Sequence, residues 1–322
     1  MTFDFWDQMT YQLELPEVKL AEFEVKKAIA AALFASVFLG LGPILIRIAE
    51  SYISPNTTIF NRFWIGAVIL GFWKVFWWQN SQTNMSEKEE PEKAKILIPL
   101  LVTIFTFFAS QMFWVWSIAK TTVANAGVLQ CLTPGFTALV GFKLFKHKFG
   151  WRLITGIVAA MVGAIGIGFS NISSSISLEG DGLALLSAIF SAAHIISVEK
   201  LRNYLSSTVI VICTFASASL LSLPILLIAE DSVFPNSEMA WIALTAAAIN
   251  MMAGQSLAAY SLKWLPSGLM TTILLLSPII TAIMGWFLFS ETLIILNLFG
   301  FVIIIGGIYL AISDTGKLKT VE

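Results

Sequence analysis

The chain has 322 residues, of which 57% are hydrophobic and 12% are charged, and its mean hydropathy is +0.83. Soluble proteins carry roughly 25% charged residues, so this composition excludes an ordinary soluble domain. The formal net charge of -1 offers no basic surface, and we expect no nucleic-acid partner.

The apolar residues fall into separate runs of about 20 residues, the length that a helix needs to cross a bilayer. Runs this long and this uniform are unlike the short strands of a membrane barrel. The lipid bilayer is therefore an expected partner. We expect ten spans, at Ala28–Ile48, Thr58–Trp78, Ile96–Ala119, Val123–Phe145, Trp151–Ser170, Gly182–Val198, Thr208–Ala229, Ala240–Leu262, Ser267–Phe289 and Leu293–Ser313.

The segments outside the spans complete the predicted organisation. Residues 1–27 form an acidic N-terminal tail without the basic start of a signal peptide, and residues 314–322 form a C-terminal tail. A Ser-rich loop at 171–181 separates a first five-helix unit, 28–170, from a second, 182–313. The predicted fold is thus an all-α polytopic membrane protein with ten transmembrane helices in two five-helix repeats.

The distribution of lysine and arginine predicts the orientation. With the N-terminus in the cytoplasm, sixteen of the 19 basic residues fall on the cytoplasmic side, and only Arg47, Arg62 and Lys120 fall outside. We therefore expect a multi-pass protein of the cell membrane with both termini cytoplasmic. Because each unit has an odd number of spans, the two units must then have opposite orientations in the bilayer.

The two units also repeat each other in sequence. Residues 111–163 align without a gap on residues 255–307, at a constant offset of 144. Matches of Gln, Pro and Gly are harder to obtain by chance than matches of Leu or Val. Inverted repeats are typical of secondary transporters, whose sites lie where the two halves meet. The informative matches are Gln111/Gln255, Pro134/Pro278, Gly156/Gly300 and Gly163/Gly307.

Several short motifs occur along the chain in the order that is typical of one transporter family. They are Asn61-Arg62-Phe63-Trp64, Ala124-Asn125-Ala126-Gly127, Thr133-Pro134-Gly135, Leu265-Pro266-Ser267-Gly268, Ser277-Pro278 and Glu291. In this order they resemble the EamA-like branch of the drug/metabolite transporter superfamily, over roughly Ala28 to Ser313. The resemblance implies five-helix units and a solute exporter or importer, without naming the solute. His147 stands where that family commonly has a Glu, and we expect the fold to tolerate it.

Polar side chains inside the spans are the candidate binding residues, because an amide in hydrocarbon is costly unless it is paired. Gln111 and Gln255 occupy equivalent places in the two units. They either line a central cavity or join neighbouring helices by hydrogen bonds. The candidate substrate-binding set is Gln111, Trp114, Asn125, Gln130, Thr133, His194, Asn250, Gln255 and Ser277.

One histidine and two arginines of the predicted spans are interpreted separately. His194 is the only histidine inside a span, and it either carries a proton or packs through a hydrogen bond. Arg47 and Arg62 flank the first outer loop, and we expect both to snorkel to the interface. The alternative for Arg62 is that it attracts an anionic group.

Pro134 and Pro278 are candidate hinges at equivalent places, each preceded by a hydroxyl residue, Thr133 or Ser277. Proline removes one helical hydrogen bond, and the carbonyl that it frees needs another partner in a membrane. The resulting bend is a place where rocking halves can flex, or else a static kink needed for packing.

The function that fits best is a secondary transporter that moves a small organic solute, an amino acid or another metabolite, by alternating access through a central cavity between the repeats. The chain lacks hydrolase, nucleotide-loop and zinc motifs, so we expect no enzyme activity, no metal and no cofactor. No span carries a central Asp or Glu, so coupling to an ion has no support. The alternatives are a membrane scaffold or lipid-handling protein and an intramembrane enzyme. The sequence leaves open whether the chain forms a homodimer.

Overall fold

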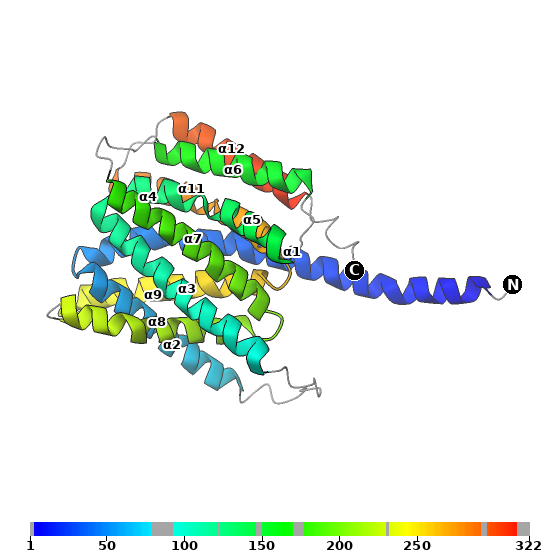
Figure 1. Cartoon of the computed structure of the whole chain (residues 1–322), viewed down its shortest axis with the longest axis horizontal. Helices are drawn as coiled ribbons and strands as arrows, with labels where there is room; N and C mark the ends of the chain where they lie inside the picture. The colour runs from blue at the N-terminus through cyan, green and yellow to red at the C-terminus, as the bar shows by residue number, and fades with distance from the viewer. Residues whose placement is uncertain are drawn as a thin grey trace.

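The computed structural model describes residues 3–78, 93–121, 123–145, 150–169, 177–229, 232–290 and 295–313. Within these ranges the regular structure is helical throughout, as predicted, and Figure 1 shows the helices gathered in one bundle. They are α1 (Phe3–Glu50), α2 (Pro55–Trp78), α3 (Lys93–Lys120), α4 (Val123–Gln130), α5 (Thr133–Phe145), α6 (Trp151–Phe169), α7 (Leu178–Leu201), α8 (Ser207–Ala229), α9 (Glu238–Ser261), α10 (Ser267–Leu274), α11 (Ser277–Phe289) and α12 (Ile295–Ile312).

Eight helical segments of the described residues are long and apolar enough to cross a membrane. One of the eight, Ser267–Phe289, joins α10 and α11, while α6 offers a shorter apolar stretch, Trp151–Ile167. The helices α4 and α5 take the place of the fourth predicted span. The chain is therefore a multi-pass membrane protein, and the count of ten spans stays a prediction.

Two predicted boundaries differ from the structure. The helix α7 begins at Leu178 and not at Gly182, because the Ser177 hydroxyl accepts a hydrogen bond from the Gly180 amide at 3.1 Å. Such a cap satisfies an amide that the first helical turn leaves open. At the other end of the chain, α1 begins at Phe3, so the expected tail and the first span form one helix.

The helices of the two units pack against each other in a symmetric pattern. The helix α1 packs along α9, and its repeat equivalent α7 packs along α3. The helix α2 contacts its own equivalent α8, and α6 lies beside its own equivalent α12 (Figure 1). This pattern is the one that a two-fold relation between the units produces.

The contact between α6 and α12 depends on glycines that the repeat places on both helices. A Cβ atom on Gly163 would lie 2.8 Å from the carbonyl oxygen of Gly300, and one on Gly300 would lie 2.8 Å from the carbonyl oxygen of Gly163. Only hydrogen fits at such positions, so these glycines let the two backbones touch.

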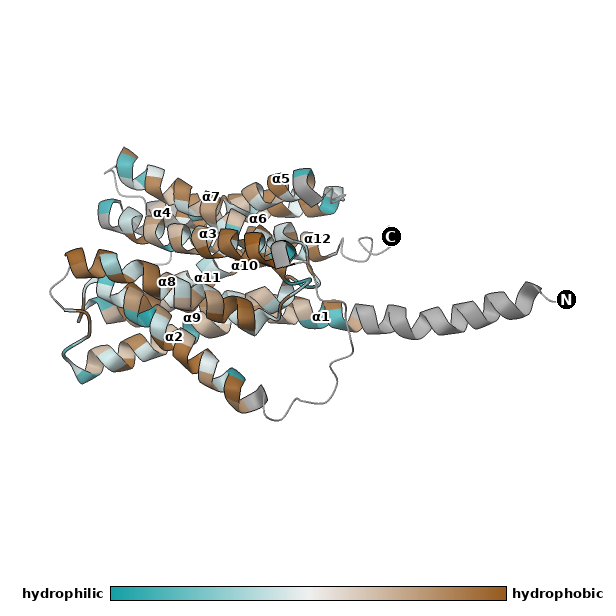
Figure 2. Cartoon of the chain, turned by 60° about the horizontal axis from the view of Figure 1, so that its bottom comes forward, coloured by the Kyte–Doolittle hydropathy of each residue, from teal (hydrophilic) through white to brown (hydrophobic). Residues whose placement is uncertain are grey.

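Aromatic side chains fill the centre of the bundle. Phe63 of α2, Phe107 of α3 and Phe215 of α8 form a triangle whose ring centroids lie 5.5, 5.6 and 5.7 Å apart. Other large apolar side chains, such as Phe287 and Tyr309, are exposed, and Figure 2 shows hydrophobic ribbon on the outside of many helices. An apolar exterior is what lipid requires.

Candidate functional site

The two units meet at a pair of interrupted helices, which replace two of the predicted continuous spans. The break between α4 and α5 lies at Cys131–Leu132, and the break between α10 and α11 lies at Leu275–Leu276. The two breaks differ by the same offset of 144 that relates the sequences. The interruption therefore belongs to both repeats.

Tight turns carry the chain through each break. The Leu132 amide donates to the Leu129 carbonyl at 3.1 Å, and the Leu276 amide donates to the Ile273 carbonyl at 3.0 Å. Bonds of this three-residue span are typical of a 3₁₀ turn inserted into an α-helix. Pro134 and Pro278 each occupy the second position of the following helix, where proline is tolerated.

The carbonyl oxygen that Pro134 leaves without a helical amide accepts a hydrogen bond from a neighbouring hydroxyl. Proline at this position leaves the Gln130 carbonyl without its helical amide, and the Thr133 hydroxyl donates to that carbonyl at 2.7 Å. The equivalent Ser277 behaves differently. Its hydroxyl donates to the Ser36 carbonyl of α1 at 3.1 Å.

A clasp holds the second break against α1, and we define it as Ser36, Gly40, Ser277 and Thr281. The Ser36 hydroxyl donates to the Ile273 carbonyl at 3.1 Å, and the Thr281 hydroxyl donates to the Gly40 carbonyl at 2.7 Å. Gly40 permits this approach, because a Cβ on it would lie 2.8 Å from the Ser277 carbonyl oxygen.

A different polar network joins the first break to α7. The Gln130 side-chain amide donates to the Ser191 hydroxyl at 3.0 Å, and the Ser191 and Ser110 hydroxyls lie 2.7 Å apart. The Ser187 hydroxyl donates to the Ser110 carbonyl at 2.9 Å. The side-chain oxygen of Gln130 is buried and accepts no hydrogen bond from the described residues, so within this part of the chain the network retains an unused acceptor.

The two broken helices also touch across the unit boundary. The hydroxyls of Thr137 on α5 and Thr271 on α10 lie 2.8 Å apart, and both side chains are buried. Carbonyl oxygens also lie within reach of these hydroxyls, that of Pro134 for Thr137 and that of Ser267 for Thr271, so one hydroxyl can donate to its own helix while the other donates across the boundary. This contact joins the two broken helices directly where the units meet.

Gln111 contacts an arginine that we expected to snorkel to the interface. Arg62 is only 4% exposed, and its terminal nitrogen donates to the Gln111 side-chain oxygen at 3.4 Å. The expectation for Arg62 is therefore wrong. Its neighbours Asn61, Phe63 and Trp64 are packed against other helices and a loop, which holds this part of α2 in the interior.

Two other predicted residues, Asn250 and His194, have partners outside these networks. Asn250 donates to the Phe38 carbonyl of α1 at 2.8 Å. His194 lies with its Nδ1 atom 3.3 Å from the Thr103 carbonyl and its ring 5.0 Å from that of Phe107. Gln255 and Trp114 are half-buried, and the side chain of Asn125 lies outside the described residues.

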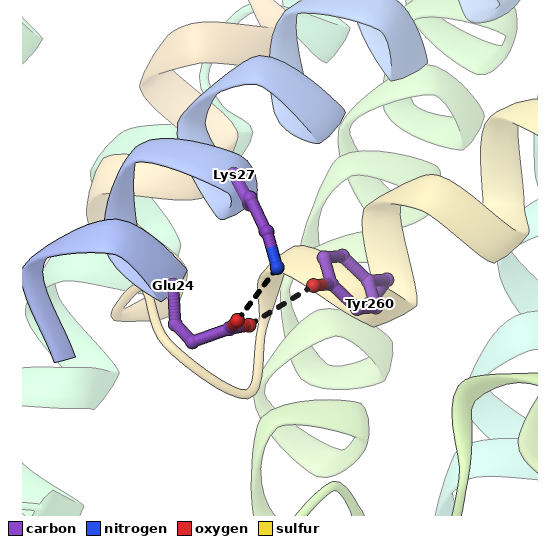
Figure 3. A network of polar contacts seen from close by, with 3 residues as sticks. All are labelled: Glu24, Lys27 and Tyr260. Atoms are coloured by element: carbon purple, nitrogen blue, oxygen red, sulfur yellow. Dashed lines mark hydrogen bonds and ion pairs between the residues drawn. The ribbon is translucent and has the colours of Figure 1, made fainter. Parts of the chain in front are cut away.

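Two further clusters close the ends of the equivalent helix pairs. Figure 3 shows Glu24 and Lys27 of α1 with Tyr260 of α9, where the carboxylate accepts from Lys27 at 2.8 Å and from Tyr260 at 3.3 Å. In the other pair, Lys120 of α3 contacts Glu179 of α7, and the Thr121 hydroxyl donates to Asp181 at 2.8 Å. Both clusters tie the start of one unit to the other unit.

Comparison with known proteins agrees with this architecture. The sequence model of the EamA-like transporter family matches residues 26–169 and 178–313. A solved structure superposes with a TM-score of 0.72 at 15% identity, over 90% of this chain and 98% of that one, which shows a shared fold.

Curated relatives cover part of the chain. A putative UDP-sugar transporter of Dictyostelium discoideum is 27% identical over 53% of this chain and 43% of its own length. An uncharacterized transporter of Methanothermobacter thermautotrophicus is 23% identical over 48% of each chain, and one of Bacillus subtilis is 25% identical over 55% of this chain and 54% of its own. The chain spans about half the length of the curated relatives it matches.

Proposed function

Because the chain belongs to the EamA-like transporter family in both of its halves, we propose that it is a secondary transporter of a small organic solute. The proposed arrangement has ten spans, in units 28–170 and 182–313, with both termini in the cytoplasm. The solute passes by alternating access at the meeting of the units. The proposal includes no enzymatic step and no cofactor.

The observation that carries the proposal is the pair of breaks at repeat-equivalent positions, joined across the units by Thr137 and Thr271. Interrupted helices expose backbone groups at membrane depth, which proteins use where a site or pathway needs them. The first broken helix also holds Gln130, whose buried side-chain oxygen accepts no hydrogen bond from the described residues.

Uptake into liposomes tests the proposal. Purified full-length protein is reconstituted and offered a panel of labelled amino acids and metabolites, with protein-free liposomes as the control. We expect saturable uptake of at least one solute class, and faster uptake when the same unlabelled solute fills the lumen. Uptake that rises linearly with concentration and ignores the lumen for every solute would contradict the proposal.

A further inference from the structure

Arg62 is a buried cation whose hydrogen-bonding capacity is largely unused. Its guanidinium carries five N–H groups. Within the described residues its one side-chain hydrogen bond is the 3.4 Å contact to Gln111, which is long for this type of bond. The Nε atom is buried and has no hydrogen-bond partner among the described residues. A buried charge with unmet donors is costly, so packing alone does not explain an arginine at this position.

No carboxylate of the described residues neutralises this charge directly. Glu50 at the end of α1 interacts with Arg62 electrostatically, but no Asp or Glu oxygen of the described chain lies within 4.0 Å of the guanidinium. The nearest aromatic partner is the Phe63 ring, 5.5 Å from the guanidinium carbon. The structure thus leaves a cation that an outside anion can satisfy.

The backbone that carries Arg62 is fixed on both sides. The Asn61 side-chain amide donates to the carbonyls of Thr57 and Val233, each at 2.8 Å. The Asn61 oxygen accepts from the Trp64 indole at 2.9 Å, and Phe63 is fully buried. A guanidinium on such a frame is preorganised, which lowers the entropy cost of binding a ligand.

Gln111 adds a donor next to the cation. Its side-chain oxygen faces Arg62, and its NH₂ group makes no hydrogen bond within the described residues. The helix α8, the equivalent of α2, contains no charged residue, so it places no arginine beside the equivalent Gln255. Only one of the two units therefore holds a cation at this place.

We propose that Arg62 and Gln111 bind an anionic group, a carboxylate or a phosphate, of the solute that the protein carries. Nε and a terminal nitrogen of arginine form a fork that matches two oxygens of such a group. The identification of this anion as part of a transported solute rests on the proposed transport function. Binding of the anion can be measured without transport, so the two proposals can fail separately.

Matched probes test the anion site in purified full-length protein. The pairs are L-lactate and L-lactamide, glucose 6-phosphate and glucose, and UMP and uridine, so that carboxylate and phosphate are tested apart. We measure the thermal unfolding midpoint against probe concentration for the wild type, Arg62→Gln, and the exposed control Arg152→Gln. At least one anion should stabilise the wild type and the control while its neutral partner does not. Arg62→Gln should bind that anion roughly ten- to a hundredfold more weakly.

A second measurement covers the case in which Arg62→Gln does not fold. Wild-type protein is treated with phenylglyoxal, and modification of Arg62 and Arg152 is followed by mass spectrometry. The stabilising anion should slow modification of Arg62 and leave that of exposed Arg152 unchanged.

The inference is overturned if no anion stabilises the wild type, if Arg62→Gln responds as the wild type does, or if the anion fails to protect Arg62. Saturable transport of a neutral solute alone would overturn it while leaving the proposed function intact. Anion binding at Arg62 without transport of any solute would contradict the proposed function and leave the anion site intact.

Discussion

A Cβ atom on Gly156 of α6 would lie 2.6 Å from the carbonyl oxygen of Gly307 on α12, so the two backbones touch at this pair. The second contact of the same helices, between Gly163 and Gly300, is its counterpart at the repeat offset of 144. Exchanging the two units converts one contact into the other. The sequence repeat is thus expressed in the structure as a two-fold packing arrangement.

Methyl groups at this contact should destabilise the bundle. Gly156→Ala and Gly307→Ala each force backbone against backbone, and we expect a loss of about 1–3 kcal/mol in unfolding free energy. Gly166→Ala and Gly306→Ala, on the same two helices, are the controls, because a Cβ on either would meet nothing within 4 Å. Thermal unfolding in detergent measures all four. Equal midpoints in the two groups would contradict the packing account.

The clasp between α1 and α11 should contribute measurably to stability. Thr281→Val removes the hydrogen bond to the Gly40 carbonyl while nearly preserving shape, and we expect a loss of about 0.6 kcal/mol, the mean for membrane hydrogen bonds between helices. Thr155→Val is the control, since Thr155 is exposed and bonds only within α6. If both variants unfold at the same midpoint, the clasp has no energetic role.

The two repeat-equivalent glutamines should separate into different roles. Gln111→Leu and Gln255→Leu should both reduce transport, because both side chains belong to the predicted substrate-binding set. Only Gln111→Leu should also lower stability, by roughly 1 kcal/mol, because it leaves Arg62 without its hydrogen-bond acceptor. Uptake and thermal unfolding are measured on the same preparations. Intact transport in both variants would contradict the prediction that these side chains bind the substrate.

Several features of the fold follow from local sequence. Glycine allows close helix approach whatever the neighbour, so the pairs at Gly156 and Gly163 could be predicted from spacing alone. Proline breaks helical bonding locally, so the disturbances near Pro134 and Pro278 could be predicted as well.

The partners of buried polar groups could not be predicted in the same way. They depend on how each helix is rotated in the bundle, and helical sequences rich in apolar residues fix that rotation weakly. Arg62 reaches Gln111, 49 residues away. The Ser277 hydroxyl turns to α1, although the equivalent Thr133 hydroxyl turns back to the last residue of α4. The serines Ser36, Ser110 and Ser191 were missed for this reason. Their one signal is a small hydroxyl on a helix that packs closely against another.

The orientation of the chain can be tested by cysteine labelling. In a variant without Cys131 and Cys213, a cysteine replacing Ser174 should react with an impermeant reagent from outside intact cells, and one replacing Ser86 should not, because basic residues stay in the cytoplasm. Both positions lie outside the described residues. The reverse labelling pattern would overturn the proposed orientation.

Exchange by the two proline variants tests alternating access between inverted units most directly. Pro134→Ala and Pro278→Ala restore a helical hydrogen bond at one break each, which should stiffen that break. Reconstituted variants should bind solute as the wild type does but exchange it across the membrane more slowly. Because the units are inverted, cysteines placed at the outer and inner ends of the pathway should change their labelling in opposite directions in the two variants. Unchanged exchange rates, or the same labelling change in both variants, would contradict the account.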